Sequence, residues 1–291
     1  MNILVTGSKG QLGSELQKIA LKDRVHQWHF TDVDDLNITR KDAVDGYFEI
    51  HGIEICINCA AYTAVDKAED EPTLAETINA QAVGILADAC RKQKALLIHI
   101  STDYVFDGEN FKPYEESDPI SAISAYGKSK ARGEAILAGK GCSFVIIRTS
   151  WLYAAFGNNF VKTMIRLGKE RPELKVVADQ VGTPTWAFDL AWAIMLFADQ
   201  YHGQYLKEIY HFSNEGAISW YDFAKAIMEA EHLDCKVLAI PSSAYPVKTK
   251  RPFYSVLSKE KFKNHFQIQV PYWKDSLLKC LQEINGQEPP K

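Results

Sequence analysis

The sequence predicts an α/β protein with a doubly wound parallel sheet and a smaller, mostly helical lobe. Three observations support this prediction. Short runs of β-branched and apolar residues alternate with amphipathic helical patterns through the first 150 or so positions. Several of these runs are apolar nearly throughout, as expected for strands that helices cover on both faces. After about residue 151 the alternation loosens, and prolines and aromatic residues become more frequent.

The first half of the chain contains the predicted strands of the sheet and the helices between them. The strands are expected at Ile3–Thr6, Gln27–Thr31, Ile55–Asn58, Leu96–Ser101 and Phe144–Arg148. Apolar residues with helical spacing between the strands mark two helix faces, one formed by Leu12, Leu16 and Ile19 and the other by Ile78, Val83, Leu86 and Ala87. Right-handed crossovers between such strands produce a doubly wound sheet.

The second half is expected to contribute one more strand and most of the lobe. A short strand near Tyr210–Phe212 is predicted to rejoin the sheet. The predicted helices are Asn159–Lys169, Thr185–Asp199, Trp220–His232 and Lys274–Ile284. The expected division is therefore residues 1–149 plus about 176–213 for the sheet domain, with 150–175 and about 214–291 for the lobe.

Composition and charge argue against several classes of protein. A chain of 291 residues, 46% of them hydrophobic, can bury a sizeable core. Its net charge of −4, with no long run of Lys or Arg, argues against nucleic-acid binding. The opening MNILVTG enters a strand directly and lacks the features of a signal peptide. No stretch approaches the roughly 18 consecutive apolar residues of a membrane span. With its scattered cysteines read as reduced thiols, the sequence predicts a cytoplasmic protein.

Three glycines follow the first predicted strand, in the segment TGSKGQLG. Gly7, Gly10 and Gly13 would permit a tight turn, close approach of the backbone to a pyrophosphate, and tight packing of helix on strand. The helix that follows would present free N–H groups to the phosphates. The spacing is G-x-x-G-x-x-G instead of the commoner G-x-G-x-x-G, and an ordinary glycine-rich turn is the alternative. In this setting the segment predicts a dinucleotide-binding, Rossmann-type sheet.

Acidic residues after the second predicted strand bear on the cofactor. Asp32 lies about 20 residues beyond the last glycine, where a carboxylate commonly accepts hydrogen bonds from the adenosine ribose. Such a charge repels a 2′-phosphate and favours NADH. However, Asp34 and Asp35 follow directly, and Lys9 could bind a 2′-phosphate. The sequence therefore leaves both NADH and NADPH open.

A hydroxyl, a phenol and an amine are spaced for proton transfer. Thr102 directly follows the fourth predicted strand, and Tyr126 and Lys130 lie at positions i and i+4 of a predicted helix, on one face. A free tyrosine has a pKa near 10, which a neighbouring ammonium and an oxidised nicotinamide are expected to lower. Thr102 would hydrogen-bond a substrate carbonyl oxygen, and Lys130 would also hold the nicotinamide ribose. The three residues predict keto-group reduction.

Two similar patterns are assigned structural roles. Tyr221 and Lys225 repeat the Tyr–Lys spacing, but no strand-end hydroxyl precedes them, so we expect an exposed helix pair. Cys56 and Cys59 form a C-x-x-C within the apolar run ICINCAA. Extended geometry would point them to opposite faces, which argues against a zinc or redox site.

Several blocks of sequence are similar to one known family. They are GSKGQLG at 7–13, NCAAYTAVDKAE at 58–69, STDYVFDG at 101–108, SAYGKSKARGE at 124–134, RTSWLYAAFGNNFVKTM at 148–164, DQVGTPT at 179–185 and RPFYSVL at 251–257. The chain resembles the extended short-chain dehydrogenases/reductases, and among them the dTDP-4-dehydrorhamnose reductases. This resemblance implies catalytic roles for Thr102, Tyr126 and Lys130. It implies cofactor contacts for Gly7, Gly10, Gln11, Leu12, Gly13, Asp32, Ala60, Ala61, Tyr126 and Lys130, and contacts with a nucleotide-sugar for Tyr104, Trp151, Asn159 and Arg251.

The resemblance also implies a reaction and partners. The expected reaction is NADPH- or NADH-dependent reduction of the C4 keto group of a dTDP-linked deoxysugar, and a homodimer is a further implication. Some members use Mg²⁺ in dimer formation, to which Glu15 could contribute, but one acid predicts no metal site. Asn37 stands where the family often has Asp, which puts adenine contacts in doubt.

Two alternatives remain open at this point. One is a nucleotide-sugar epimerase or dehydratase of the same family. A dehydratase has Glu where this chain has Tyr104, which argues against dehydration. The other is a non-catalytic regulatory subunit resembling that of methionine adenosyltransferase, against which the intact Thr102, Tyr126 and Lys130 argue.

Overall fold

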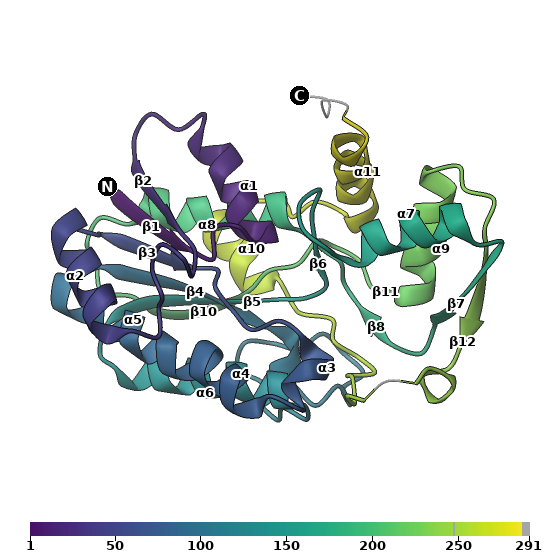
Figure 1. Cartoon of the computed structure of the whole chain (residues 1–291), viewed down its shortest axis with the longest axis horizontal. Coiled ribbons are helices and arrows are strands. Elements are labelled where there is room, and N and C mark those ends of the chain that lie inside the picture. Colours follow the sequence, from purple (N-terminus) through teal and green to yellow (C-terminus); the bar gives the residue numbers. More distant parts are fainter. Residues whose placement is uncertain (247, 287–291) are drawn as a thin grey trace.

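A parallel sheet forms the centre of the computed structural model, which describes residues 1–246 and 248–286 (Figure 1). Within these residues six strands pair in the order β10-β5-β4-β3-β1-β2, and every pairing is parallel. The strands are β1 (Asn2–Thr6), β2 (Gln27–Thr31), β3 (Ile55–Asn58), β4 (Leu96–Thr102), β5 (Ser143–Thr149) and β10 (Lys207–His211). From β1 the chain adds β2 on one side and then β3, β4 and β5 on the other, which is the change of winding direction that defines doubly wound folds.

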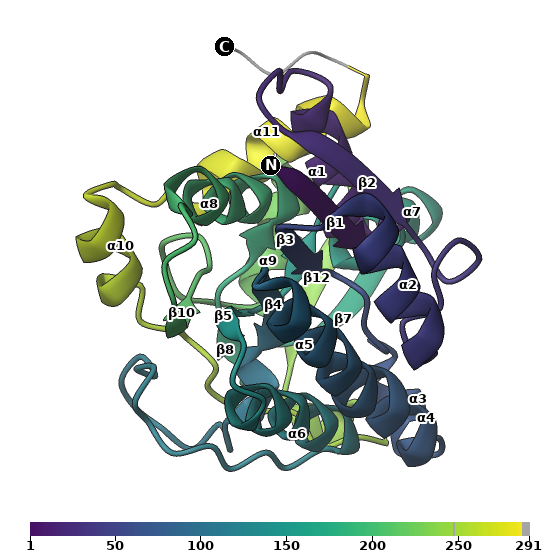
Figure 2. The ribbon, with the colours of Figure 1, turned by 90° about the vertical axis from the view of Figure 1, so that its left-hand side faces the viewer.

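Helices cover both faces of the sheet (Figures 1 and 2). One face carries α1 (Gln11–Ala20), α8 (Ala187–Gln200) and α10 (Glu260–Phe266), and the other carries α2 (Lys41–His51), α5 (Ala82–Gln93) and α6 (Ala125–Gly139). Strand side chains alternate between the two cores, so Ile3 and Val5 pack in one and Leu4 in the other. Cys56 and Cys59 likewise pack in opposite cores, which confirms the prediction that they point to opposite faces of the sheet.

Short segments link β3 and β4 to the helices that follow them. After β3 come α3 (Val65–Ala68), α4 (Pro72–Glu76) and a π-helical turn, η1 (Thr77–Gln81), which leads into α5. After β4 comes a 3₁₀ turn, η2 (Asp103–Val105). These segments lie at the carboxyl edge of the sheet and pack against α6.

The lobe has its own apolar core, built mainly by α7 (Phe160–Glu170), α9 (Trp220–Ala230) and α11 (Trp273–Ile284). A parallel pair of strands, β7 (Glu173–Val177) and β12 (Lys236–Ile240), covers one side, and a 3₁₀ turn, η3 (Ser242–Ala244), follows β12. Two smaller pairs complete the lobe. They are β8 (Val181–Gly182) with β11 (Ile218–Ser219), and β6 (Leu152–Tyr153) with β9 (Thr185–Trp186).

The predicted elements correspond closely to the observed ones. The second and third strands have the predicted bounds, and the other strands and the lobe helices differ by one to a few residues at an end. The predicted strand near Tyr210–Phe212 is β10, at the edge of the sheet. The parallel pair β7 and β12 in the lobe was not predicted. Helix α10 lies in the range 214–291 that was expected for the lobe, but it packs on the sheet instead.

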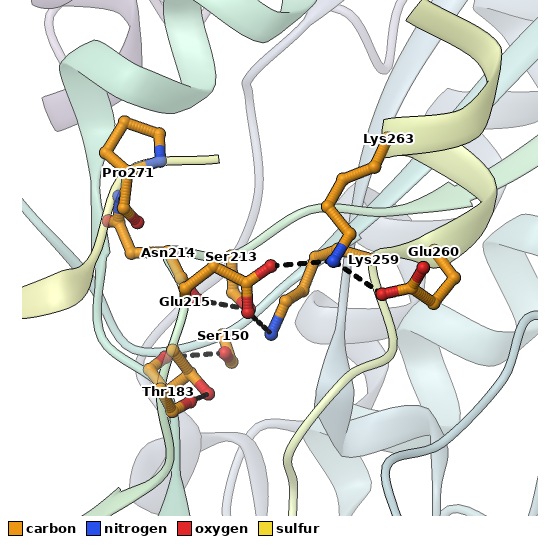
Figure 3. A network of polar contacts seen from close by, with 10 residues as sticks. Ser150, Thr183, Ser213, Asn214, Glu215, Lys259, Glu260, Lys263 and Pro271 are labelled. Carbon is orange, nitrogen blue, oxygen red and sulfur yellow. Dashed lines mark hydrogen bonds and ion pairs between the residues drawn. The ribbon is translucent and has the colours of Figure 1, made fainter. Parts of the chain in front are cut away.

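A polar network braces the junction between sheet and lobe (Figure 3). The carboxylate of Glu215 lies between two ammonium groups, 3.4 Å from Lys259 Nζ and 3.1 Å from Lys263 Nζ. Nearby, the Ser150 hydroxyl donates to the Thr183 carbonyl at 2.7 Å. These contacts hold the segments that enter and leave the lobe in fixed positions beside the cleft described below.

Within the described residues, no helix has the length and apolarity needed to cross a membrane.

Candidate active site

A cleft of about 1060 Å³ opens at the carboxyl edge of the sheet, between the sheet and the lobe. This is the edge where doubly wound folds bind ligands. Every site residue predicted from the sequence lines this one cleft: Gly7, Gly10, Gln11, Leu12, Gly13, Asp32, Ala60, Ala61, Thr102, Tyr104, Tyr126, Lys130, Trp151, Asn159 and Arg251. Residues from positions 7 to 251 therefore form a single site, and their individual roles stay predictions.

The phosphate loop is shaped by close backbone contacts. Gly7 has φ +67°, and a Cβ there would lie 2.7 Å from the Cα of Ala60, so only glycine fits. The contact places Ala60 and the loop side by side along the cleft. In the described structure Gly10 precedes α1 and no side chain caps that helix. The first N–H groups of α1 are therefore available to an anion.

The acids after β2 have separate roles. Asp32 lines the cleft and accepts a hydrogen bond from the Lys9 amide at 3.0 Å. Asp34 forms an ion pair with Lys9 Nζ at 3.1 Å, and Asp35 accepts from the Asp32 amide. Of the three acids, only Asp32 is among the residues that line the cleft, where Lys9 is the cation beside it. Asn37 also lines the cleft, where its side chain accepts from the amide and hydroxyl of Thr39.

Close packing of α6 on η2 brings Tyr126 beside Thr102. Ser124 caps α6 by accepting from the Gly127 amide at 3.1 Å. A Cβ on Gly127 would lie 2.2 Å from the Tyr104 carbonyl oxygen, so a larger residue would push the helix away. The rings of Tyr104 and Tyr126 meet edge to face with centroids 5.5 Å apart. Local sequence thus determines the distance between the phenol and the strand end.

The Tyr126 phenol is protonated in this environment. Burial raises its pKa to about 12, opposed by its hydrogen bond with Thr102. The prediction that Lys130 lowers this pKa does not hold for the protein alone, because loss of solvation is the larger effect. The Thr102 hydroxyl donates to Asp103 at 2.9 Å and accepts from the Tyr104 amide at 3.2 Å. A protonated phenol is the state required of a general acid.

Lys130 is buried beneath the cleft. Its Nζ donates to the Ile100 carbonyl at 2.7 Å. Burial lowers the pKa of Lys130 to about 8, opposed by the nearby carboxylate of Glu134 and by Cys59. An amine with such a pKa can exist in either protonation state near neutral pH.

A buried ion pair anchors α6 to β5. Arg148 donates to Glu134 through Nε and Nη2, at 3.0 and 2.7 Å, and both side chains are almost fully buried. Glu134 also accepts from the Ser101 hydroxyl. Arg148 lies over the Phe106 ring at 5.2 Å, and its Nη1 is 3.3 Å from His211 Nε2. Glu134 is one helical turn beyond Lys130, so this anchor determines where α6 presents its reactive side chains.

An aromatic wall forms the lobe side of the cleft. Trp151 has φ +47°, a strained conformation for a bulky residue, and stacks on Trp220 with ring centroids 3.5 Å apart. Gly182 makes room for it, because a Cβ there would lie 2.6 Å from the indole. Trp220 was not predicted as a site residue. The capping box that begins its helix indicates only where α9 starts.

Arg251 and Asn159 also line the cleft. Arg251 Nη2 pairs with Asp66 at 3.0 Å, while its buried Nε has no hydrogen-bond partner among the described residues. Asn159 caps α7 and donates to Gln11 Oε1 at 2.9 Å, which links the lobe to the phosphate loop. The same nitrogen donates to the Ala154 carbonyl at 2.7 Å, so a substrate would have to displace one of these two acceptors to take a hydrogen bond from this amide.

The chain is similar to one family over nearly its full length. The family model described as "RmlD substrate binding domain" matches residues 1–285. The dTDP-4-dehydrorhamnose reductase of Aggregatibacter actinomycetemcomitans is 42% identical over 284 residues, covering 94% of this chain and 96% of that protein. The chain belongs to the dTDP-4-dehydrorhamnose reductase family. This confirms the resemblance inferred from the sequence blocks.

Solved structures of the family share the fold. The dTDP-4-dehydrorhamnose reductase of Clostridium acetobutylicum superposes with a TM-score of 0.93 at 44% identity, covering 98% of this chain and 100% of that one. The Bacillus anthracis reductase, solved with NADP, has a TM-score of 0.90 at 38% identity and covers 97% of this chain and 99% of its own. In this chain, the glycine loop, the uncapped α1 and the adjacent Ala60 fit a dinucleotide of that kind.

The residues around Glu15 do not fit a magnesium ion. Glu15 is buried on α1, and its carboxylate lies 2.9 Å from Lys18 Nζ, which also pairs with Glu283 on α11. Burial raises the pKa of Glu15 to about 7, opposed by Lys18. The ammonium already supplies the positive charge between the two carboxylates. In the described part of the chain, no group of three His, Cys, Asp or Glu side chains could hold a metal.

Proposed function

We propose that this protein reduces the C4 keto group of dTDP-6-deoxy-L-lyxo-4-hexulose to give dTDP-L-rhamnose, with NADH or NADPH as hydride donor. The observation that supports this most strongly is the cleft itself. It combines Thr102, Tyr126 and Lys130 with a dinucleotide loop and an aromatic wall, in a chain of this reductase family.

Tyr126 is the proton donor of the proposed reaction. A reduced nicotinamide, when bound, supplies the hydride that C4 accepts. As C4 becomes tetrahedral, the carbonyl oxygen gains negative charge and takes the proton from the Tyr126 hydroxyl. The raised pKa of Tyr126, about 12, keeps the phenol protonated until that charge develops. Thr102 stabilises the same oxygen once its hydroxyl proton, which Asp103 accepts at 2.9 Å in the protein alone, turns to donate to that oxygen.

The lobe and the η2 turn are proposed to hold the nucleotide-sugar. Trp151, backed by Trp220, offers a rigid apolar face for a sugar or thymine ring. Tyr104 borders the same space next to Tyr126. Arg251 suits the diphosphate, because its planar guanidinium matches phosphate oxygens and its Nε has no hydrogen-bond partner in the described part of the chain.

The structure favours reduction over dehydration. A dehydratase must remove a proton at C5, which requires a base beside the reacting sugar. Burial raises the pKa of Tyr104. Its phenol therefore stays protonated near neutral pH and cannot accept the proton from C5. An epimerase would retain its dinucleotide through turnover, and a reductase must exchange it.

The experiment that tests the proposal mixes purified protein with enzymatically generated dTDP-6-deoxy-L-lyxo-4-hexulose and either NADH or NADPH. Loss of reduced-nicotinamide absorbance together with dTDP-L-rhamnose as product is expected. Protein that carries tightly bound NAD and converts sugars without consuming reduced cofactor would favour an epimerase instead. No conversion with either cofactor would overturn the proposal.

A further inference from the structure

A buried chain of polar side chains crosses the sheet beneath the cleft and ends at Lys130. Thr6 Oγ1 is 2.7 Å from Asn58 Oδ1, the Asn58 amide nitrogen is 3.1 Å from His99 Nδ1, and His99 Nε2 is 3.4 Å from Lys130 Nζ. The strand register places Thr6 beside Asn58 and Asn58 beside His99. None of the four residues is more than 2% exposed. This row of side chains begins at Thr6, the residue directly before Gly7 of the phosphate loop.

The direction of these hydrogen bonds follows from chemistry. A lysine ammonium can only donate, so His99 must accept through Nε2 and carry its proton on Nδ1. Burial lowers the pKa of His99 well below its ordinary value, which keeps the ring neutral. The Nδ1 proton then needs an acceptor, and the Asn58 amide provides it if its oxygen faces His99 and its NH₂ group faces Thr6. Exchanging the oxygen and nitrogen of the Asn58 amide leaves the positions of the heavy atoms unchanged. The donors and acceptors around the amide therefore decide which orientation is present.

We propose that His99 is a positioning residue for Lys130. Together, His99 Nε2 and the Ile100 carbonyl accept two of the three N–H bonds of the ammonium and leave the third to face the cleft, which Lys130 lines. The other ionisable groups that act on Lys130 are Glu134 on α6 and Cys59 after β3. Without these acceptors, the flexible four-carbon side chain could adopt other rotamers.

Loss of His99 has a consequence specific to this role. The buried ammonium would lose an acceptor, which favours the neutral amine and lowers the pKa of Lys130. A hydrogen bond to a charged group is worth about one to two pKa units. The pH at which activity falls on the basic side would therefore move to lower values, which a purely structural role would not produce.

The test compares His99→Phe with His99→Gln in the full-length protein. Phenylalanine keeps the ring and removes the acceptor, whereas the glutamine side-chain oxygen reaches approximately the position of Nε2. The readouts are the pH profile of kcat/KM for keto-sugar reduction and the Kd of NADPH from fluorescence titration. The kinetic readout rests on the proposed function, which the wild-type protein tests in the same assay.

For His99→Phe we expect kcat/KM to fall about 10- to 100-fold and NADPH to bind more weakly. In the pH profile of kcat/KM, the fall on the basic side (the basic limb) should occur about one pH unit lower. His99→Gln should restore most of each. Asn58→Leu leaves His99 in place and removes the partner of Nδ1 together with the contact to Thr6. It should shift the basic side of the pH profile in the same direction by less, and it serves if His99→Phe does not fold. A folded His99→Phe or Asn58→Leu protein with the wild-type basic limb and NADPH affinity, beside an active wild type, would overturn the inference.

Discussion

Removal of Glu134 should destabilise the protein severely, because it leaves the Arg148 guanidinium buried without a counter-charge. Arg148 and Glu134 have side chains only 2% and 4% exposed, and two N–H groups of Arg148 donate to the carboxylate. Breaking such a pair costs about 3–5 kcal/mol. That is about 100- to 5,000-fold in the folding equilibrium, and a large part of the roughly 5–15 kcal/mol that stabilises a typical domain.

The assay is equilibrium unfolding in urea, followed by tryptophan fluorescence. Glu134→Ala is compared with Glu170→Ala, which removes an exposed pair between Arg166 and Glu170 and should cost about 0.5 kcal/mol or less. Replacing both partners of the buried pair, as in Glu134→Leu with Arg148→Met, should cost less than Glu134→Ala, since no charge is left unpaired. A Glu134→Ala protein within about 1 kcal/mol of wild type would refute the reasoning.

Three further predictions concern the cleft. Tyr126→Phe should abolish turnover and leave the Kd of NADPH nearly unchanged, and near-normal turnover would remove Tyr126 from its assigned role. Lys130→Met should be inactive. The folded-state pKa of Lys130, about 8, lies below its ordinary 10.5, so burial of the charge penalises the folded wild type below pH 8 and the penalty disappears as pH rises to 10.5. Urea unfolding should therefore show wild type gaining up to about 3 kcal/mol relative to Lys130→Met across that window, and a constant difference would contradict the pKa. Lys9→Met should lower kcat/KM about tenfold with NADPH and by less than about twofold with NADH, because Lys9 is a cation that lines the cleft together with Asp32. Equal losses with both cofactors would exclude contact between Lys9 and a 2′-phosphate.

The elements predicted best from the sequence are those determined by local pattern. The strands Gln27–Thr31 and Ile55–Asn58 have the predicted bounds, because each is a short run bordered by residues that end it. The glycine loop was predictable from its spacing after a strand, and backbone contacts require glycine at Gly7 and Gly13, where a Cβ would lie 2.7 and 2.5 Å from neighbouring backbone atoms. Thr102, Tyr126 and Lys130 were predictable from their spacing, which places them at a strand end and on one helix face.

The features that escaped prediction depend on tertiary packing. Trp220 reaches the cleft because Trp151 stacks on it from a segment about 70 residues earlier. The partnership of Arg148 with Glu134, and that of His99 with Lys130, depend on how α6 packs against the sheet. The pKa of the Tyr126 phenol was predicted wrongly for the same reason. The spacing of Tyr126 and Lys130 suggested a lowered phenol pKa, whereas burial, which no local pattern reveals, raises it.

The most direct test of the central claim follows the hydride itself. The protein is mixed with dTDP-6-deoxy-L-lyxo-4-hexulose and reduced cofactor that carries deuterium at both positions of the nicotinamide C4, and the product is examined by mass spectrometry and proton NMR. The account predicts dTDP-L-rhamnose with one deuterium, bonded to the sugar C4, and no such product from the Tyr126→Phe protein. A product without deuterium, or with deuterium at another carbon, would contradict it.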